Sequence, residues 1–354
     1  MSSDPFRPQK PSHITSVTEG LCALTATEAV ARLRAGEVTA AELVEASIAR
    51  IEEVDPKVNA LPIPCFDRAR DMAREMARKL RPEDHADNPK SLCGLPIAVK
   101  DYNDVGGVRT TYGSPIFAQS VAAQSDATVR QLERNGAIPM AKSNVPEWAG
   151  GNTFNPVFGA TRNPWDLRMS VGGSSGGSAA ALALGTASLA TGSDIGGSIR
   201  IPASCCGLVG YKPPYGRNPD DIPFNLDFYC HTGPLARSVD DAILLQNVMS
   251  GQHPWDISTL PKIVLPTEYP DIRGWKIALS MDLGSFTISD EVRKNTLAAA
   301  DTFRALGASV EEVEIGWGPE VPEACLKYLT HLFGGALSQE LADHAEDMTS
   351  YCRT

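Results

Sequence analysis

The chain has 354 residues, of which 42% are hydrophobic and 21% are charged, and its formal net charge is −11. This is the composition of a globular protein that can bury a large core. The acidic balance disfavours a nucleic-acid-binding groove, which needs a basic face, and no apolar run reaches membrane-spanning length. The eight cysteines form no CxxC pair and no HExxH motif is present, which favours reduced thiols in a cytoplasmic protein over a zinc site or a disulfide scaffold.

Helical signals dominate the N-terminal part of the chain. Residues 1–24 are expected to form an arm, and two Thr-x-x-Glu capping boxes, at 25–28 and 39–42, then predict the starts of two helices. Apolar residues at helical spacing follow each box. A third helix is predicted from about residue 65 to residue 80.

Short apolar runs alternate with helical patterns in the rest of the chain. Such alternation predicts an α/β fold with a sheet that is covered by helices on both faces. No Pro/Ser-rich linker divides the sequence, so we expect one domain over residues 25–354. Strands are predicted over 96–99, 137–140, 208–211, 276–279 and 310–315, and helices over 126–135, over 178–184 and from Ser289 onward.

Two glycine-rich segments carry the strongest chemical signal. They read Gly-Gly-Ser-Ser-Gly-Gly-Ser at 172–178 and Asp-Ile-Gly-Gly-Ser-Ile-Arg-Ile-Pro at 194–202. Glycine permits sharp turns and leaves backbone N–H groups free to converge on an anion. An acyl-transfer site needs such N–H groups beside a hydroxyl nucleophile, for which Ser198 is the leading candidate. The alternative is a tight turn in which Ser198 only caps a helix.

A serine hydroxyl needs a base to become nucleophilic at neutral pH. Of the six histidines, only His231 lies in a motif-like setting. The other candidate is Lys100, which ends the apolar run 95–99, because burial depresses the pKa of a lysine. Its alternative role is an ion pair with Asp101 or Asp104.

The serine pair at positions 174 and 175 is ambiguous from chemistry alone. Both Ser174 and Ser175 satisfy G-x-S-x-G, which is also the nucleophile-elbow pattern of α/β-hydrolases. In a chain this rich in glycine the pattern is weak evidence, and the residues alone do not separate the two serines.

These motifs, in this order, resemble the amidase signature family. The resemblance extends from about residue 20 to at least residue 315, with its core motifs within 94–240. It implies a single large mixed β-sheet covered by helices on both faces, and a chain that lacks the usual C-terminal portion of the family. The matching segments are 94–101, 126–129, 141–144, 162–165, 172–213 and 233–240.

The family uses a Ser–Ser–Lys triad. Carried over by motif position, the resemblance implies that Ser198 is the nucleophile, that Ser174 is the bridging residue on a cis peptide bond, and that Lys100 is the terminal base. Lys142 resembles a structural lysine of the family. The resemblance also implies an oxyanion hole from the amides of Ile195, Gly196, Gly197 and Ser198, and supporting roles for Ser175, Asp194 and Arg200.

The resemblance further implies an amidase that hydrolyses the C–N bond of a small or aryl/acyl amide through a serine acyl-enzyme, without a metal or an organic cofactor. A small-molecule amide is the expected partner, nucleic acid and membrane are not, and a homodimer stays open. Two alternatives remain, namely the glutaminase (A-type) subunit of a tRNA-dependent amidotransferase and a truncated, inactive amidase-like protein. Phe228 and Tyr229 are expected to line the substrate pocket, although core packing explains them as well.

Overall fold

The computed structural model describes residues 14, 19–79, 91–269 and 271–353. The chain divides into two compact units, one of Met1–Leu265 with His344–Thr354 and one of Pro266–Asp343. Most of the predicted arm, 1–24, lies outside the described residues. None of the helices in the described ranges is long and apolar enough to cross a bilayer.

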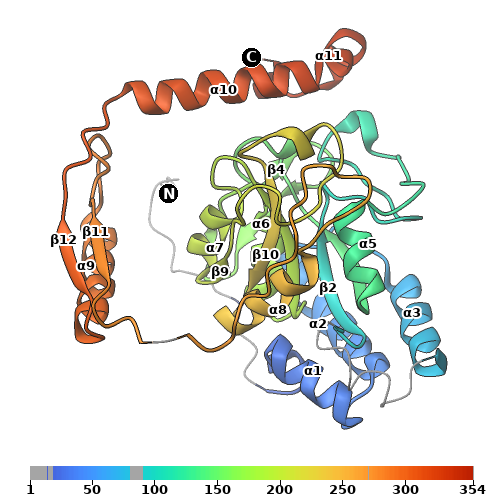
Figure 1. Ribbon diagram of the computed structural model, residues 1–354. Coiled ribbons are helices and arrows are strands. Elements are labelled where there is room, and N and C mark those ends of the chain that lie inside the picture. Colours follow the sequence, from blue (N-terminus) through green and yellow to red (C-terminus); the bar gives the residue numbers. More distant parts are fainter. Residues whose placement is uncertain (1–13, 15–18, 80–90, 270, 354) are drawn as a thin grey trace, which may run out of the picture. The chain divides into compact units, whose positions relative to one another are not determined.

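A mixed six-stranded sheet organises the first unit (Figure 1). The central strands β3, β2 and β8 run parallel to one another, whereas β10 is antiparallel to both β8 and β9, and β1 is antiparallel to β3. The predicted mixed sheet is therefore confirmed. In sheet order the strands are β1 (Ile63–Pro64), β3 (Ala137–Ser143), β2 (Leu95–Lys100), β8 (Leu189–Asp194), β10 (His231–Ala236) and β9 (Val209–Gly210).

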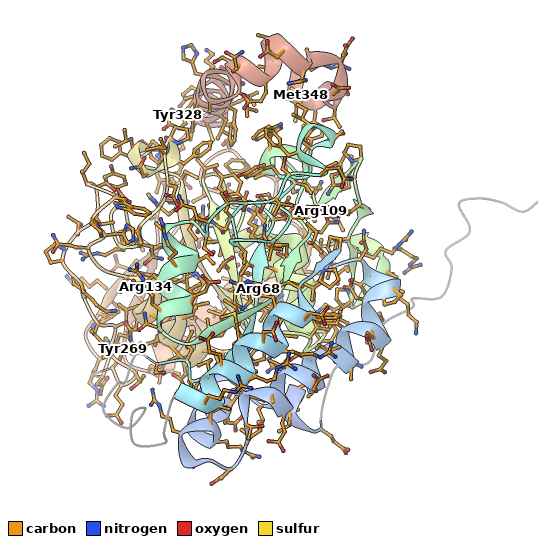
Figure 2. The ribbon with its side chains drawn as sticks, turned by 90° about the vertical axis from the view of Figure 1, so that its right-hand side faces the viewer. Arg68, Arg109, Arg134, Tyr269, Tyr328 and Met348 are labelled. Carbon is orange, nitrogen blue, oxygen red and sulfur yellow. The ribbon has the colours of Figure 1, made fainter. Side chains whose placement is uncertain are left out.

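Helices cover both faces of this sheet and bury two apolar cores. Ala98 belongs to the first core and Ile97 to the second, because successive side chains of a strand point to opposite faces. The first core contains α2 (Ala40–Val58), α3 (Phe66–Lys79), α6 (Gly176–Ala183) and α7 (Arg200–Cys206), and the second contains α1 (Ala26–Ala35), α5 (Ala127–Arg134) and α8 (Val239–Met249). Arg68 of α3, labelled in Figure 2, donates to Glu133 of α5 at 2.5 Å.

Both predicted capping boxes are present. The hydroxyl of Thr25 accepts the N–H of Glu28 at the start of α1, and the Glu28 carboxylate accepts the N–H of Thr25. Thr39 and Glu42 repeat this exchange at α2. Each exchange satisfies two amide groups that the first helical turn leaves without a partner.

Short elements connect the main ones within the first unit. They are η1 (Leu21–Ala23), η2 (Pro115–Phe117), η3 (Glu147–Ala149), β4 (Phe154–Asn155), β5 (Gly159–Ala160), β6 (Arg162–Asn163), β7 (Asp166–Ser170), η4 (Phe224–Leu226), η5 (Ala345–Asp347) and α12 (Ser350–Arg353). The strand pairs β4–β5 and β6–β7 are antiparallel.

The predicted strands near 276 and 310 form a small sheet of their own in the second unit. β11 (Lys276–Leu279) pairs with β12 (Ser309–Glu312) in parallel, and α9 (Asp290–Ala305) connects them. A parallel pair needs a crossover of this length, so the three elements close on themselves as one βαβ unit. The unit continues into α10 (Glu320–Ala336) and α11 (Ser338–His344).

A glycine in α6 allows close packing that a larger residue would prevent. A Cβ on Gly177 would lie 2.3 Å from the Asn144 nitrogen and 2.6 Å from the Ala60 carbonyl oxygen. We expect Gly177→Ala to lower the free energy of unfolding by about 1–3 kcal/mol, although alanine is normally the better helix former. Urea unfolding followed by circular dichroism measures the change.

The matched control is Gly334→Ala in α10, where a Cβ would meet nothing within 4 Å. This substitution should leave the unfolding of the first unit unchanged. Equal effects of the two substitutions would show that Gly177 is not held against its neighbours.

Candidate active site

Lys100 ends β2, between β3 and β8, and its side chain is fully buried. Its N–H donates to the Thr191 hydroxyl at 2.9 Å, and its Nζ lies 2.7 Å from Ser174 Oγ. Burial lowers the pKa of Lys100 to about 7, and the opposing influence of Cys230, Asp194 and Asp220 is smaller. A substantial fraction of this amine is therefore neutral near pH 7, as a proton acceptor must be.

Ser174 and Ser175 open helix α6. The Gly173–Ser174 peptide bond is cis, as the family resemblance implies, and Ser174 is buried. Ser175 is the N-cap residue of α6, and its N–H donates to the Ser198 carbonyl oxygen at 3.1 Å. The Ser174 hydroxyl thus points at Lys100, while Ser175 ties the two glycine-rich segments together through the backbone.

Ser198 lies between β8 and α7 and is partly exposed to solvent. Within the described ranges its hydroxyl forms no hydrogen bond. Hydrogen bonds of catalytic groups are often long before substrate binds. Ser198 is therefore the solvent-accessible member of the predicted triad, while Ser174 and Lys100 are buried.

The carboxylate of Asp194 organises the turn that carries Ser198. It receives two bonds of 2.9 Å from the Arg200 guanidinium and accepts the N–H groups of Gly197 and Ile199 at 2.7 and 3.1 Å. Burial opposes the charge on Asp194, but these bonds outweigh it and lower its pKa. Asp194 and Arg200 thus contact each other and the turn that carries Ser198, and their supporting role stays a prediction.

The four predicted oxyanion donors differ in their present bonding. The Gly197 amide is bonded to Asp194. Among the described residues, the amides of Ile195, Gly196 and Ser198 make no hydrogen bond. These three are the ones free to meet a new acceptor.

The second buried lysine has a different environment. Lys142 Nζ lies 2.9 Å from Asp101 Oδ1 and 2.7 Å from Thr110 Oγ1, and both charged side chains are inaccessible to solvent. The proposed pairing of Lys100 with Asp101 is therefore not found, because Asp101 pairs with Lys142.

One serine of the site carries no motif signal of its own in the sequence. Ser193 is buried on β8, and its Oγ lies 2.8 Å from Lys100 Nζ. It precedes Asp194 in the glycine-rich segment, but nothing in that pattern distinguishes it from an ordinary strand serine.

The aromatic and histidine candidates lie around the same end of the sheet. His231 Nε2 is 2.9 Å from the Phe228 carbonyl oxygen, and burial lowers the pKa of this histidine. Phe228 and Tyr229 are 68% and 57% exposed, and the centroid of the Phe228 ring lies 4.7 Å from that of Tyr215, with the two rings tilted by 48°. Core packing therefore does not account for Phe228 and Tyr229.

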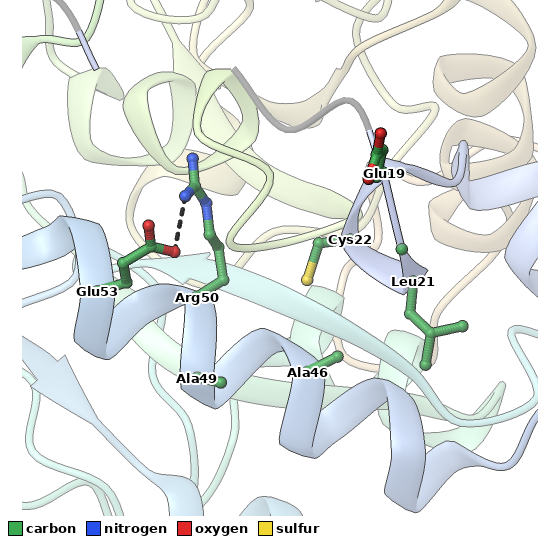
Figure 3. Close-up of a pocket in the computed structure, with 8 residues that line it drawn as sticks. Glu19, Leu21, Cys22, Ala46, Ala49, Arg50 and Glu53 are labelled. Carbon is green, nitrogen blue, oxygen red and sulfur yellow. Dashed lines mark hydrogen bonds and ion pairs between the residues drawn. The ribbon is translucent and has the colours of Figure 1, made fainter. Parts of the chain in front are cut away.

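A surface pocket elsewhere contains none of the triad residues. It lies between η1 and α2, where Arg50 pairs with Glu53 at 2.8 Å (Figure 3). Its lining residues are Glu19, Gly20, Leu21, Cys22, Ala46, Ala49, Arg50 and Glu53. Within the part of the chain that the structure describes, no three His, Cys, Asp or Glu residues are grouped to hold a metal ion.

Comparison with known proteins agrees with this architecture. The model of the family Amidase matches residues 42–352. The chain is 39% identical over 305 residues to the A-type subunit of the glutamyl-tRNA(Gln) amidotransferase of Carboxydothermus hydrogenoformans, covering 82% of this chain and 61% of that relative. It is 35% identical to an acylamidase of Rhodococcus erythropolis, covering 83% and 62%.

Solved structures show the same fold. A bacterial aryl acylamidase of the amidase signature family superposes with a TM-score of 0.82 at 29% identity, covering 93% of this chain and 71% of that one. The 6-aminohexanoate cyclic dimer hydrolase gives 0.75 at 33% identity, covering 84% and 62%. The chain thus belongs to the amidase signature family, and it spans about three fifths of the length of the curated relatives described above.

Removal of the charge should lower the free energy of unfolding at Lys142 but not at Lys100. Lys142→Met leaves the Asp101 carboxylate buried and unpaired, and should cost roughly 3–5 kcal/mol of unfolding free energy. Lys100→Met removes an amine that has no carboxylate partner among the residues that the structure describes, so it should keep the fold and remove any amide hydrolysis that needs this amine. Urea unfolding and an amide-hydrolysis assay on both variants separate the two effects. Loss of folding in Lys100→Met with normal folding in Lys142→Met would reverse the assignment.

Proposed function

We propose that this protein is an amide hydrolase that works through a Ser198–Ser174–Lys100 triad and a serine acyl-enzyme. The observation that carries the proposal is the 2.7 Å contact between Ser174 Oγ and the buried amine of Lys100, whose pKa burial lowers to about 7. Membership of the amidase signature family supports it. The substrate class is a small or aryl/acyl amide.

In the acylation step, neutral Lys100 takes the proton of the Ser174 hydroxyl while Ser174 takes that of Ser198. The Ser198 oxygen forms a bond to the amide carbon, and the carbonyl electron pair moves to the oxygen. The backbone amides of Ile195, Gly196 and Ser198 are the proposed donors to this oxyanion, each worth roughly 3–4 kcal/mol in comparable sites.

The tetrahedral intermediate then collapses with cleavage of the C–N bond. The leaving nitrogen takes the proton of Ser174, which recovers one from Lys100. An amide needs this protonation more than an ester does, because an amine anion is a poor leaving group. Water repeats the sequence on the acyl-enzyme, releases the carboxylic acid and restores Ser198.

Exposed rings near the site are the proposed lining of the substrate pocket. Phe228 and Tyr229 present apolar surface that the folded chain does not bury. Such surface contributes to ligand binding when an apolar group covers it.

A second candidate function is the glutaminase subunit of a tRNA-dependent amidotransferase. Several similar relatives are named as A-type subunits of glutamyl-tRNA(Gln) amidotransferases. The same triad would then release ammonia from glutamine within a complex. Turnover of aryl amides by the chain alone favours the first candidate, whereas turnover of glutamine only in the presence of partner subunits favours the second.

Fluorophosphonate labelling tests the nucleophile directly. A single adduct should map to Ser198 by peptide mass spectrometry, and both Ser198→Ala and Lys100→Ala should lose it. Ser204→Ala, an exposed serine on α7, is the matched control and should label as the wild type does. An adduct on Ser175, or persistence of the label in Ser198→Ala, would exclude the proposed triad.

The pH dependence tests the base. The value of kcat/KM should rise as pH increases through about 7, because protonated Lys100 has no lone pair and the neutral amine is the acceptor. Measuring kcat/KM for one aryl amide at a series of pH values follows this rise. Returning each sample to the optimum pH before a second assay controls for irreversible unfolding. A profile that is flat between about pH 5 and pH 9 would exclude a lysine base of this kind.

A further inference from the structure

In the described part of the chain, three oxygen atoms lie within hydrogen-bonding distance of the Lys100 amine. Ser174 Oγ lies at 2.7 Å, Ser193 Oγ at 2.8 Å and the Ser193 carbonyl oxygen at 3.4 Å. Two of the three therefore belong to a residue outside the triad. Ser193 is buried, so water does not compete for these positions.

The number of protons on the amine decides what each oxygen does. A neutral lysine has two N–H bonds and one lone pair, and a carbonyl oxygen can only accept. If the two Ser193 oxygens accept both N–H groups, the lone pair is left for the Ser174 hydroxyl, which is the orientation that a base requires. After proton transfer the ammonium has three N–H groups and meets the same three acceptors.

The position of Ser193 is set by the backbone. Its N–H donates to Ser175 Oγ at 3.3 Å, and Ser175 Oγ also contacts the Ser193 carbonyl oxygen at 3.4 Å. On the other side, Ser193 is in register with Thr232 of β10. The backbone of Ser193, including its carbonyl oxygen, is thus held relative to the Ser174–Ser175 segment before substrate arrives.

We propose that Ser193 is a positioning residue that directs the lone pair of Lys100 toward Ser174 in the neutral state and stabilises the ammonium after proton transfer. This role rests on the proposed function of Lys100 as the base. It needs no movement of the surrounding groups during the proton transfer, which is the condition under which fixed dipoles contribute most to catalysis.

Other groups around Lys100 define the background against which Ser193 acts. Burial lowers the pKa of the amine, whereas Cys230, Asp194 and Asp220 raise it. The ring of Tyr102 lies 5.6 Å from Nζ. A change at Ser193 leaves all of these groups in place, so its effect can be measured separately.

The test compares Ser193→Ala with Ser193→Thr. Ser193→Ala removes one acceptor of the ammonium, so the acidic limb of kcat/KM should move to lower pH, and kcat should fall roughly 10- to 100-fold with KM unchanged. Ser193→Thr keeps the hydroxyl, so both its acidic limb and its kcat should stay close to the wild-type values. Ser204→Ala is the control for a serine that lies away from Lys100.

A second readout does not depend on turnover. The pKa of Lys100 can be followed by NMR in protein labelled with 13C at lysine Cε, with Lys100→Met to assign the resonance. Ser193→Ala should lower this pKa, and Ser193→Thr should leave it near the wild-type value.

An unchanged Lys100 pKa in Ser193→Ala would overturn the proposal. So would a Ser193→Ala variant faster than the wild type, because the Ser193 hydroxyl would then be donating to the lone pair and competing with Ser174. If the wild type neither labels nor turns over an amide, the proposed function fails, while the titration still decides the role of Ser193.

Discussion

The site depends on the burial of one amine, that of Lys100, which has no carboxylate partner in the described part of the chain. Desolvation disfavours the ammonium form of Lys100, and among the described residues only hydroxyl and carbonyl oxygens lie within hydrogen-bonding distance of Nζ. A carboxylate at that position would keep the amine charged. The chain provides one to its other buried lysine, Lys142, which is paired with Asp101 and serves the fold instead. The two buried lysines therefore differ in the oxygen atoms that they contact. Lys100 contacts hydroxyl and carbonyl oxygens, whereas Lys142 contacts a carboxylate.

Much of the architecture could be predicted from local signals. The capping boxes at Thr25 and Thr39, the helix that starts after Ser289 and the strand that ends at Lys100 all depend on short-range physics, and the structure confirms each of them. The juxtaposition of Lys100 with Ser174 follows from the family motifs rather than from residue chemistry. Chemistry alone left Ser174 and Ser175 equivalent, and the direction of each side chain at the start of α6 distinguishes them.

Other features could not be predicted because they depend on contacts distant in sequence. Ser193 lies 93 residues from Lys100 along the chain and carries no motif of its own. The separate pairing of β11 with β12 depends on which strand edges meet, and strand periodicity does not encode this. The exposure of Phe228 also depends on tertiary packing. The sequence around an aromatic residue does not show whether its ring is buried in a core or exposed on the surface.

Strand β8 places two successive side chains in separate networks. Ser193 contacts Lys100, and Asp194 binds Arg200 and the amides of the turn that carries Ser198. Because side chains alternate along a strand, insertion or deletion of a single residue here would exchange the two faces and dismantle both networks at once. The segment is thus far less tolerant of a change in length than of a change in composition. Changes in length are correspondingly better tolerated in the surrounding loops, where they need not move Lys100 or Ser198.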